Sequence, residues 1–150
     1  MTDLEIRPAT HADIPAIVQM LADDPLGAQR ESLDDLTPYT AAFERLASDP
    51  HNHIVVAVRE GRVVGTLQLT IIPGLSRRGA TRSIIEGVRV HADERGSGLG
   101  TQLIEWAIEE SRRLQCRLVQ LTSDASRTDA RRFYERLGFE ASHVGFKMAL

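Results

Sequence analysis

Cysteine is nearly absent from the sequence, since Cys116 is the only one among 150 residues. A disulfide within the chain is therefore excluded, which is compatible with the reducing environment of the cytoplasm. No apolar run approaches the roughly 20 residues that cross a bilayer. The first residues also lack the basic segment and the apolar core of a signal peptide. We expect a cytoplasmic protein with no membrane partner.

An excess of basic charge is also missing. The 18 Lys and Arg residues are outnumbered by 21 Asp and Glu, and the net charge is -3, so the charge gives no indication of nucleic-acid binding. The five histidines are scattered and do not have the spacing of metal ligands, so no metal site is expected: His11, His51, His53, His91 and His143. The length and an apolar content of 42% fit one domain with a full core, over residues 1–150.

Hydrophobic periodicity predicts an α/β fold. Apolar or alternating runs predict strands at 4–7, 53–58, 63–72, 83–90 and 117–122. Helical spacing predicts helices at 11–23, from Thr37 to about residue 49, at 99–114, and from Thr128 to Leu137. Residues 29–36 have no clear pattern, residues 73–79 are expected to form a loop, and one or two last strands are expected in 139–150. The strands between 53 and 90 should form an antiparallel meander, and a crossover should make 84–90 and 117–122 parallel.

Three glycines follow the strand at 84–90 and open the next helix. Gly96, Gly98 and Gly100 remove side chains where backbone N–H groups converge at a helix start, which favours a cradle for phosphate oxygens. A dinucleotide-binding fingerprint would need Gly where Thr101 stands and an acid about twenty residues later. A P-loop would need Gly-Lys-Ser/Thr, which is absent.

Two motifs together resemble a known family. Arg95-Gly-Ser-Gly98-Leu-Gly100 resembles the acyl-CoA pyrophosphate loop of the GCN5-related N-acetyltransferases (GNAT), whose pattern is Gln/Arg-x-x-Gly-x-Gly/Ala. Residues 130–139, Ala-Arg-Arg-Phe-Tyr-Glu-Arg-Leu-Gly-Phe, resemble the family's Ala-x-x-Phe-Tyr-x-x-x-Gly-Phe signature. The resemblance implies the GNAT acyl-CoA N-acyltransferase fold, with a mixed central sheet that splays between two parallel strands and helices on both faces.

The resemblance also implies acetyl-CoA as co-substrate and a set of residues that bind it. The pyrophosphate would lie on the loop formed by Arg95, Gly96, Ser97, Gly98, Leu99, Gly100 and Thr101. The backbone of Val88, Arg89 and Val90 would pair with the pantetheine arm as an extra strand would. Many members carry Asn near the start of the Tyr-bearing helix, where this chain has Arg127, which can instead reach a CoA phosphate.

Tyr134 and Glu86 are the candidate catalytic residues. Tyr134 resembles the tyrosine that protonates the leaving thiolate, with packing of its ring on the core as the alternative. Glu86 is the candidate base, because a carboxylate in an apolar strand needs a partner or a role, and burial would raise its pKa. The alternative is a structural ion pair with a residue such as Arg82. A two-residue period places Glu86, Val88 and Val90 on one face of the strand.

The acceptor side is indicated only by its charges. Asp23, Asp24, Glu31, Asp34 and Asp35 either attract a cationic amine or form a solvated surface. Arg77, Arg78 and Arg82 either grip an anionic group of the acceptor or are solvated or paired with acids.

The activity we predict is acetyl-CoA-dependent N-acetylation of a primary amine of a small molecule, by direct attack in a ternary complex. The alternatives are a non-catalytic acyl-CoA-binding sensor or regulatory module, and a peptide or protein N-acetyltransferase. The end of the chain is similar to aminoalkylphosphonate acetyltransferases, and the Ile-Glu of the 84–90 strand to glucosamine-phosphate acetyltransferases. A homodimer is expected as well, since the family often forms dimers through its C-terminal half.

Overall fold

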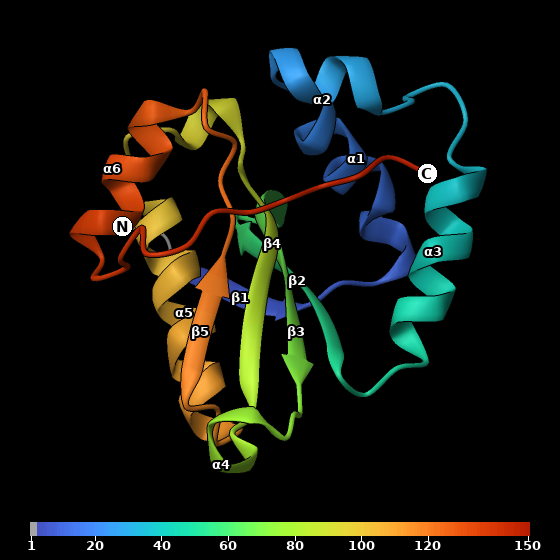
Figure 1. Cartoon of the computed structure of the whole chain (residues 1–150). Helices are drawn as coiled ribbons and strands as arrows, with labels where there is room; N and C mark the ends of the chain where they lie inside the picture. Colours follow the sequence, from blue (N-terminus) through green and yellow to red (C-terminus); the bar gives the residue numbers. More distant parts are fainter. Residues whose placement is uncertain (1–2) are drawn as a thin grey trace.

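The computed structural model describes residues 3–150 and contains a five-stranded sheet (Figure 1). The strands lie in chain order: β1 (Leu4–Pro8), β2 (Asn52–Arg59), β3 (Arg62–Ile72), β4 (Arg82–Val90) and β5 (Leu118–Leu121). The pairs from β1 to β4 are antiparallel, and β4 and β5 are parallel. The predicted mixed sheet is confirmed.

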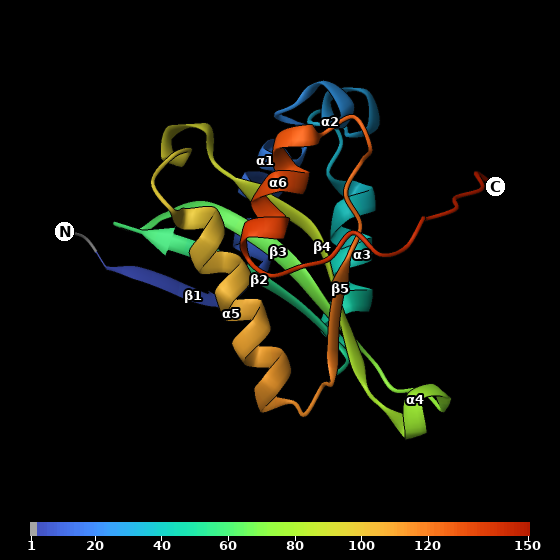
Figure 2. The same cartoon turned by 60° about the vertical axis from the view of Figure 1, so that its left-hand side comes forward.

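The longer helices cover both faces of the sheet (Figures 1 and 2). On one side lie α1 (Ile14–Ala22), α2 (Pro25–Arg30) and α3 (Thr37–Ala47). On the other lie α5 (Leu99–Arg113) and α6 (Thr128–Arg136). Three short helical segments complete the set: η1 (His11–Asp13), α4 (Ser76–Gly79) and η2 (Ala92–Glu94).

The core lies mainly between the sheet and α5. The predicted apolar stripe of this helix is buried at Leu99, Leu103, Ile104 and Ala107, against sheet residues such as Leu67, Leu69 and Ile85. One polar contact joins the two layers, where the hydroxyls of Ser83 in β4 and Ser111 in α5 lie 2.7 Å apart. This packing fixes the start of α5 relative to the end of β4.

Three segments differ from the sequence-based expectation. Residues 25–30, where no helix was expected, form α2, because Asp24 accepts a hydrogen bond from the Gly27 N–H at 2.5 Å and caps the helix before Pro25. The expected loop at 73–79 contains α4, in which Arg77 and Arg78 adopt φ of 54° and 61°. The strands expected in 139–150 are absent, because the backbone of that segment pairs with no strand and the sheet ends at β5 in the described chain.

Candidate active site

The sheet splays where β5 ends and β4 continues. Parallel pairing runs from Arg82–Leu118 to Ile85–Leu121 and then stops. In the described chain, residues 86–90 of β4 therefore have no strand beside them on that edge (Figure 1). An extended ligand can add to a free strand edge of this kind through backbone hydrogen bonds. The splay implied by the family resemblance is thus present.

A β-bulge interrupts β4 at the start of the splay. The register with β3 passes from Gln68–Glu86 to Thr66–Arg89, so β4 has one residue more than its partner. Gly87 has φ of 63°, a backbone conformation that favours glycine. Glu86 and Arg89 consequently share a face, whereas Val90, opposite Gly65, lies on the other. The expectation that Glu86, Val88 and Val90 share one face is wrong, and the glycine inside the strand was the signal that could have predicted it.

The glycine loop between η2 and α5 has the geometry of an anion cradle. Gly96 and Gly98 have φ of 84° and 86°, and a Cβ at either position would meet no atom within 4 Å. Gly98 is the residue before Leu99, the first of α5, and the first N–H groups of a helix have no intrahelical acceptor. Those donors and the helix dipole favour a phosphate at this end. Ser97 uses its hydroxyl inside the loop, as a donor to the Glu94 carbonyl at 2.5 Å.

Gly100 has a different role from the other two loop glycines. A Cβ there would lie 3.4 Å from Cζ of Phe133 and 3.7 Å from Cγ2 of Val90. Both distances are ordinary van der Waals contacts, so α6 and β4 pack closely on the first turn of α5 at this position. This contact brings α6, and with it Tyr134, beside the splay.

Tyr134 lies half-buried in an aromatic group on α6. Its ring packs edge-on against Phe133 and Phe139, with centroids 5.1 and 6.0 Å apart. Burial raises the pKa of the Tyr134 phenol, while the positive charges of Arg89 and Arg127 lower it in part. The phenol is therefore protonated at neutral pH and close to two cations, as a proton donor to a forming anion would need to be.

Arginines predicted to bind the cofactor meet acids from the junction of α1 and α2. Oδ2 of Asp24 lies 3.0 Å from Nη2 of Arg127 and 3.6 Å from Nε of Arg89. Oδ2 of Asp23 lies 3.3 Å from Nη2 of Arg95. The Gly27 N–H, and then the two arginines, lower the pKa of Asp24. Asp23 and Asp24 thus form ion pairs with arginines of the predicted cofactor site. Neither interpretation of the acidic region, attraction of a cationic amine or a solvated surface, includes these pairs.

Arg89 is the most enclosed of these cations. Its side chain is 19% exposed, and burial lowers the pKa of its guanidinium. Nη1 donates to the Val88 carbonyl at 2.9 Å, but Nε is buried and has no hydrogen-bond partner within residues 3–150. A buried donor without a partner is a group that a bound anion or carbonyl can satisfy.

Glu86 is exposed on the face of the sheet that α1 and α3 cover. The expected burial in a dry strand is wrong, because the splay leaves this part of β4 without a neighbouring strand. No ion pair with Arg82, or with any other residue from 3 to 150, is present for Glu86. The structural alternative for this residue therefore has no support.

Arg77 and Arg78 lie away from the site. They belong to α4, at the end of the sheet where β4 begins, while the glycine loop follows the other end of β4 (Figures 1 and 2). Arg82 is the first residue of β4, at that same distant end. Of the two interpretations, contact with the acceptor therefore has no support, and the exposure of all three side chains agrees with a solvated trio.

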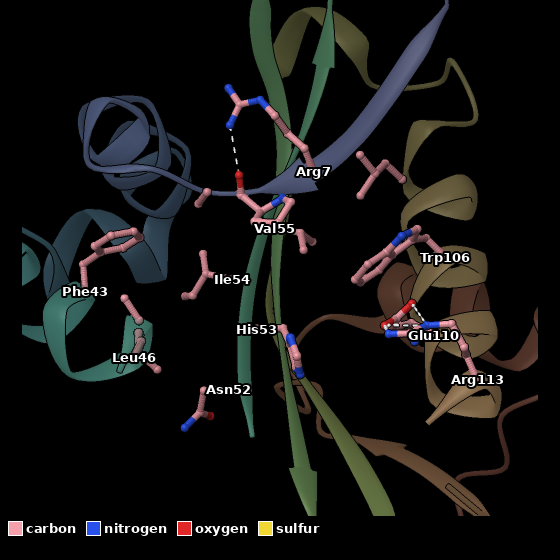
Figure 3. Close-up of a pocket in the computed structure, with 14 residues that line it drawn as sticks. Arg7, Phe43, Leu46, Asn52, His53, Ile54, Val55, Trp106, Glu110 and Arg113 are labelled. Atoms are coloured by element: carbon pink, nitrogen blue, oxygen red, sulfur yellow. Dashed lines mark hydrogen bonds and ion pairs between the residues drawn. The ribbon is translucent and has the colours of Figure 1, made fainter. Parts of the chain in front are cut away.

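A pocket of about 450 Å³, which the sequence did not predict, lies beside β1 and β2 (Figure 3). Phe43 and Leu46 of α3 line one side, and Trp106 and Glu110 of α5 the other. Arg113 lowers the pKa of Glu110 through a hydrogen-bonded ion pair. The pocket includes neither β4, the glycine loop nor Tyr134, so it is separate from the candidate site.

No group of three or more His, Cys, Asp or Glu side chains in residues 3–150 could hold a metal ion. None of the helices described is long and apolar enough to cross a membrane.

Known proteins resemble the chain over nearly its whole length. The model of the Acetyltransferase (GNAT) family matches residues 14–139. An aminoalkylphosphonate N-acetyltransferase of Salmonella typhimurium is 34% identical over 97% of this chain and 91% of its own length. A glucosamine 6-phosphate N-acetyltransferase of Trypanosoma brucei brucei is 42% identical over 100% and 98%. A crystal structure described as a transcriptional regulator from Bacillus halodurans is 46% identical, covers 99% of this chain and 100% of its own, and has a TM-score of 0.95.

Proposed function

The chain belongs to the GNAT family of acyltransferases, and we propose that it transfers the acetyl group of acetyl-CoA to the primary amine of a small molecule. The main observation in support of this proposal is the splay of β4 and β5 beside the glycine loop. It offers a free strand edge for an extended thioester arm. The same end of the sheet offers a helix start with open space at Gly96 and Gly98 for phosphates.

Residues around the splay would hold the co-substrate. The loop from Arg95 to Thr101 would receive the pyrophosphate, with Arg127 near a CoA phosphate. The backbone of Val88, Arg89 and Val90 would pair with the pantetheine arm. Asp23 and Asp24 now neutralise Arg95 and Arg127, so binding of the phosphates would exchange one set of anions for another around the same cations.

Tyr134 and Glu86 would move the two protons of the reaction. The amine nitrogen attacks the thioester carbonyl carbon, the C–N bond forms, and the C–S bond breaks. Glu86, exposed toward α1 and α3, would accept the proton that the ammonium must lose, directly or through one water. Tyr134, on α6 at the opposite side of the splay, would donate its proton to the leaving thiolate. The two groups would thus act from opposite sides of β4, Glu86 on the acceptor and Tyr134 on the leaving group.

We propose a primary amine that carries a phosphonate or phosphate group as the acceptor. The two relatives named above are an aminoalkylphosphonate and a glucosamine 6-phosphate acetyltransferase, and each matches nearly the whole chain. Arg89 gives this class a physical basis. It is enclosed, its Nε makes no hydrogen bond within residues 3–150, and it shares a face of the sheet with Glu86.

A regulatory acyl-CoA-binding module is the second candidate, favoured by the description of the Bacillus halodurans structure. Release of free CoA thiol from acetyl-CoA, with a panel of amines, distinguishes the two. The panel spans aminoalkylphosphonates, aminosugar phosphates, polyamines, amino acids and peptide N-termini. We expect thiol release with at least one small anionic amine. Calorimetric binding of acetyl-CoA with no release for any amine would support the regulatory module, and release only with peptides would support peptide acetylation.

A further inference from the structure

Four arginines lie at the end of the sheet opposite the glycine loop. β4 and β5 begin at this end, α5 ends there, and α4 lies at its extremity (Figures 1 and 2). All four residues are exposed, and none forms an ion pair with a residue from 3 to 150. We call this group the basic end: Arg77, Arg78, Arg82 and Arg117.

The two stretches of sequence that hold the basic end contain no acids. No Asp or Glu stands between Glu60 and Glu86, a stretch that holds three of the four arginines. None stands between Glu110 and Asp124, around Arg117. The last two acids of α5 each pair with an arginine of the same helix. Positive charge is therefore segregated at this end of a chain whose net charge is -3, and it complements an anionic surface.

An exposed leucine stands next to these arginines. Leu75 immediately precedes α4 and is 95% exposed. Its carbonyl accepts a hydrogen bond from the Gly79 N–H at 2.9 Å, which closes the turn between them. Within that turn Arg77 and Arg78 have φ of 54° and 61°, a left-handed conformation that residues other than glycine adopt infrequently. One apolar side chain and two cations are thus held in a single tight turn.

A cationic surface with an exposed apolar side chain fits a lipid bilayer better than a nucleic acid. In a bilayer that contains anionic lipids, phosphates lie directly above the hydrocarbon. Arginines can pair with those phosphates through parallel hydrogen bonds, while a neighbouring leucine reaches the acyl chains. A nucleic acid backbone also offers phosphates, but it has no apolar layer for Leu75.

We propose that the basic end, together with Leu75, binds the surface of a bilayer that contains anionic phospholipids. The arginines pair with lipid phosphates, and Leu75 enters the boundary between head groups and acyl chains. The glycine loop then faces the aqueous side, because it lies at the opposite end of the sheet (Figure 1). The expectation of no membrane partner rests on the absence of an apolar span and of a signal peptide, and surface binding needs neither.

Sedimentation of the full chain with lipid vesicles tests this proposal. We expect binding to vesicles of equal parts phosphatidylglycerol and phosphatidylcholine, and none to vesicles of phosphatidylcholine alone. An arginine near an anionic surface raises the partition coefficient about fivefold, so Arg77→Gln combined with Arg78→Gln should lower it about 25-fold. The matched control, Arg131→Gln with Arg132→Gln, removes the same charge from exposed positions of α6 and should bind nearly as the natural chain does.

A second variant tests the apolar contact. Leu75→Ser leaves every charge in place and should still weaken binding severalfold, and circular dichroism should show the same fold for all variants. Absence of binding to the anionic vesicles, equal binding to both kinds of vesicle, or an equal loss in the two double-arginine variants would overturn the proposal. Binding to a DNA duplex that depends on Arg77 and Arg78, without binding to anionic vesicles, would overturn it in favour of a nucleic-acid partner.

Discussion

Tyr134→Phe removes a single hydroxyl from the candidate site and leaves its packing in place. The ring would keep its edge-on contacts with Phe133 and Phe139, at 5.1 and 6.0 Å, so the fold should persist with a change in stability of about 0.5 kcal/mol or less. The lost group is a phenol whose pKa burial raises, so it is protonated at neutral pH and available for donation.

The expected effect is on kcat. General-acid catalysis by a placed side chain contributes about 10²- to 10⁴-fold, which corresponds to about 3 to 5 kcal/mol of transition-state free energy. Acetyl-CoA affinity should be nearly unchanged, because the hydroxyl would act on the thiolate as it leaves. A proton donor must also be protonated, so activity of the natural enzyme should fall only as the pH rises through the raised pKa of Tyr134.

The only other tyrosine provides the control. Tyr39 in α3 donates to Glu31 at 2.9 Å and accepts the Ser32 N–H at 2.8 Å, so Tyr39→Phe also removes a phenol hydroxyl, but from a helix other than α6. Steady-state release of CoA thiol and calorimetric acetyl-CoA binding should be measured for both variants. If Tyr134→Phe has the same kcat as Tyr39→Phe, with chemistry as the slow step, then Tyr134 serves only to pack α6 on the core.

Three further variants test the other residues. Glu86→Gln should lower kcat/KM by about 10²-fold and be partly rescued at higher pH, where more acceptor arrives as free amine; full activity at pH 7 would leave Glu86 without a role as base. Gly98→Glu should abolish calorimetric acetyl-CoA binding, whereas Gly61→Glu, at a turn glycine with φ of 75° and equally open surroundings, should bind normally; equal binding by both would contradict the pyrophosphate site. Arg7 holds the pKa of buried Asp13 below its ordinary value, through hydrogen bonds of 2.8 and 3.1 Å. The Asp13 carboxylate therefore stabilises the fold fully above the pKa of an unfolded Asp, near 3.9. This stabilisation is lost as the pH falls through the lower pKa of the folded state. In urea unfolding at pH 7, Asp13→Asn should therefore lower the free energy of unfolding by about 2 kcal/mol, and this difference should shrink below about pH 4. A difference independent of pH would show that the charge of Asp13 is not what stabilises the fold.

Local pattern was enough to predict the centre of the molecule. Apolar periodicity predicts the helix from Leu99 and the two parallel strands that it connects. The short segment that contains Gly96 and Gly98 marks where the first of these strands ends and the helix begins. The positive φ of these two residues is a local property, and a glycine in the sequence indicates where it can occur. The splay and the position of Tyr134 followed from the family resemblance, since no periodicity indicates where two strands part.

Features that depend on tertiary contact were missed or misplaced. The bulge at Gly87 changed the face of the residues after Glu86, and a strict two-residue period cannot represent an added residue. Asp24 pairs with Arg127 across 103 positions of sequence, a separation that no local pattern encodes. One or two strands were expected in 139–150, but a strand also needs a partner, and no strand pairs with that segment in the described chain.

Direct transfer of the acetyl group from acetyl-CoA to a small amine, in a ternary complex, is the activity that remains to be measured. The most direct measurement uses one acceptor found in the amine panel. It records the amounts of free CoA thiol and of N-acetylated amine over time, and the mass of the protein after incubation with acetyl-CoA alone. We expect thiol and acetylated amine in equal amounts, both dependent on enzyme, and a protein mass that acetyl-CoA alone does not change. Thiol release without acetylated amine, or an acetylated protein that passes its group to the amine, would contradict direct transfer.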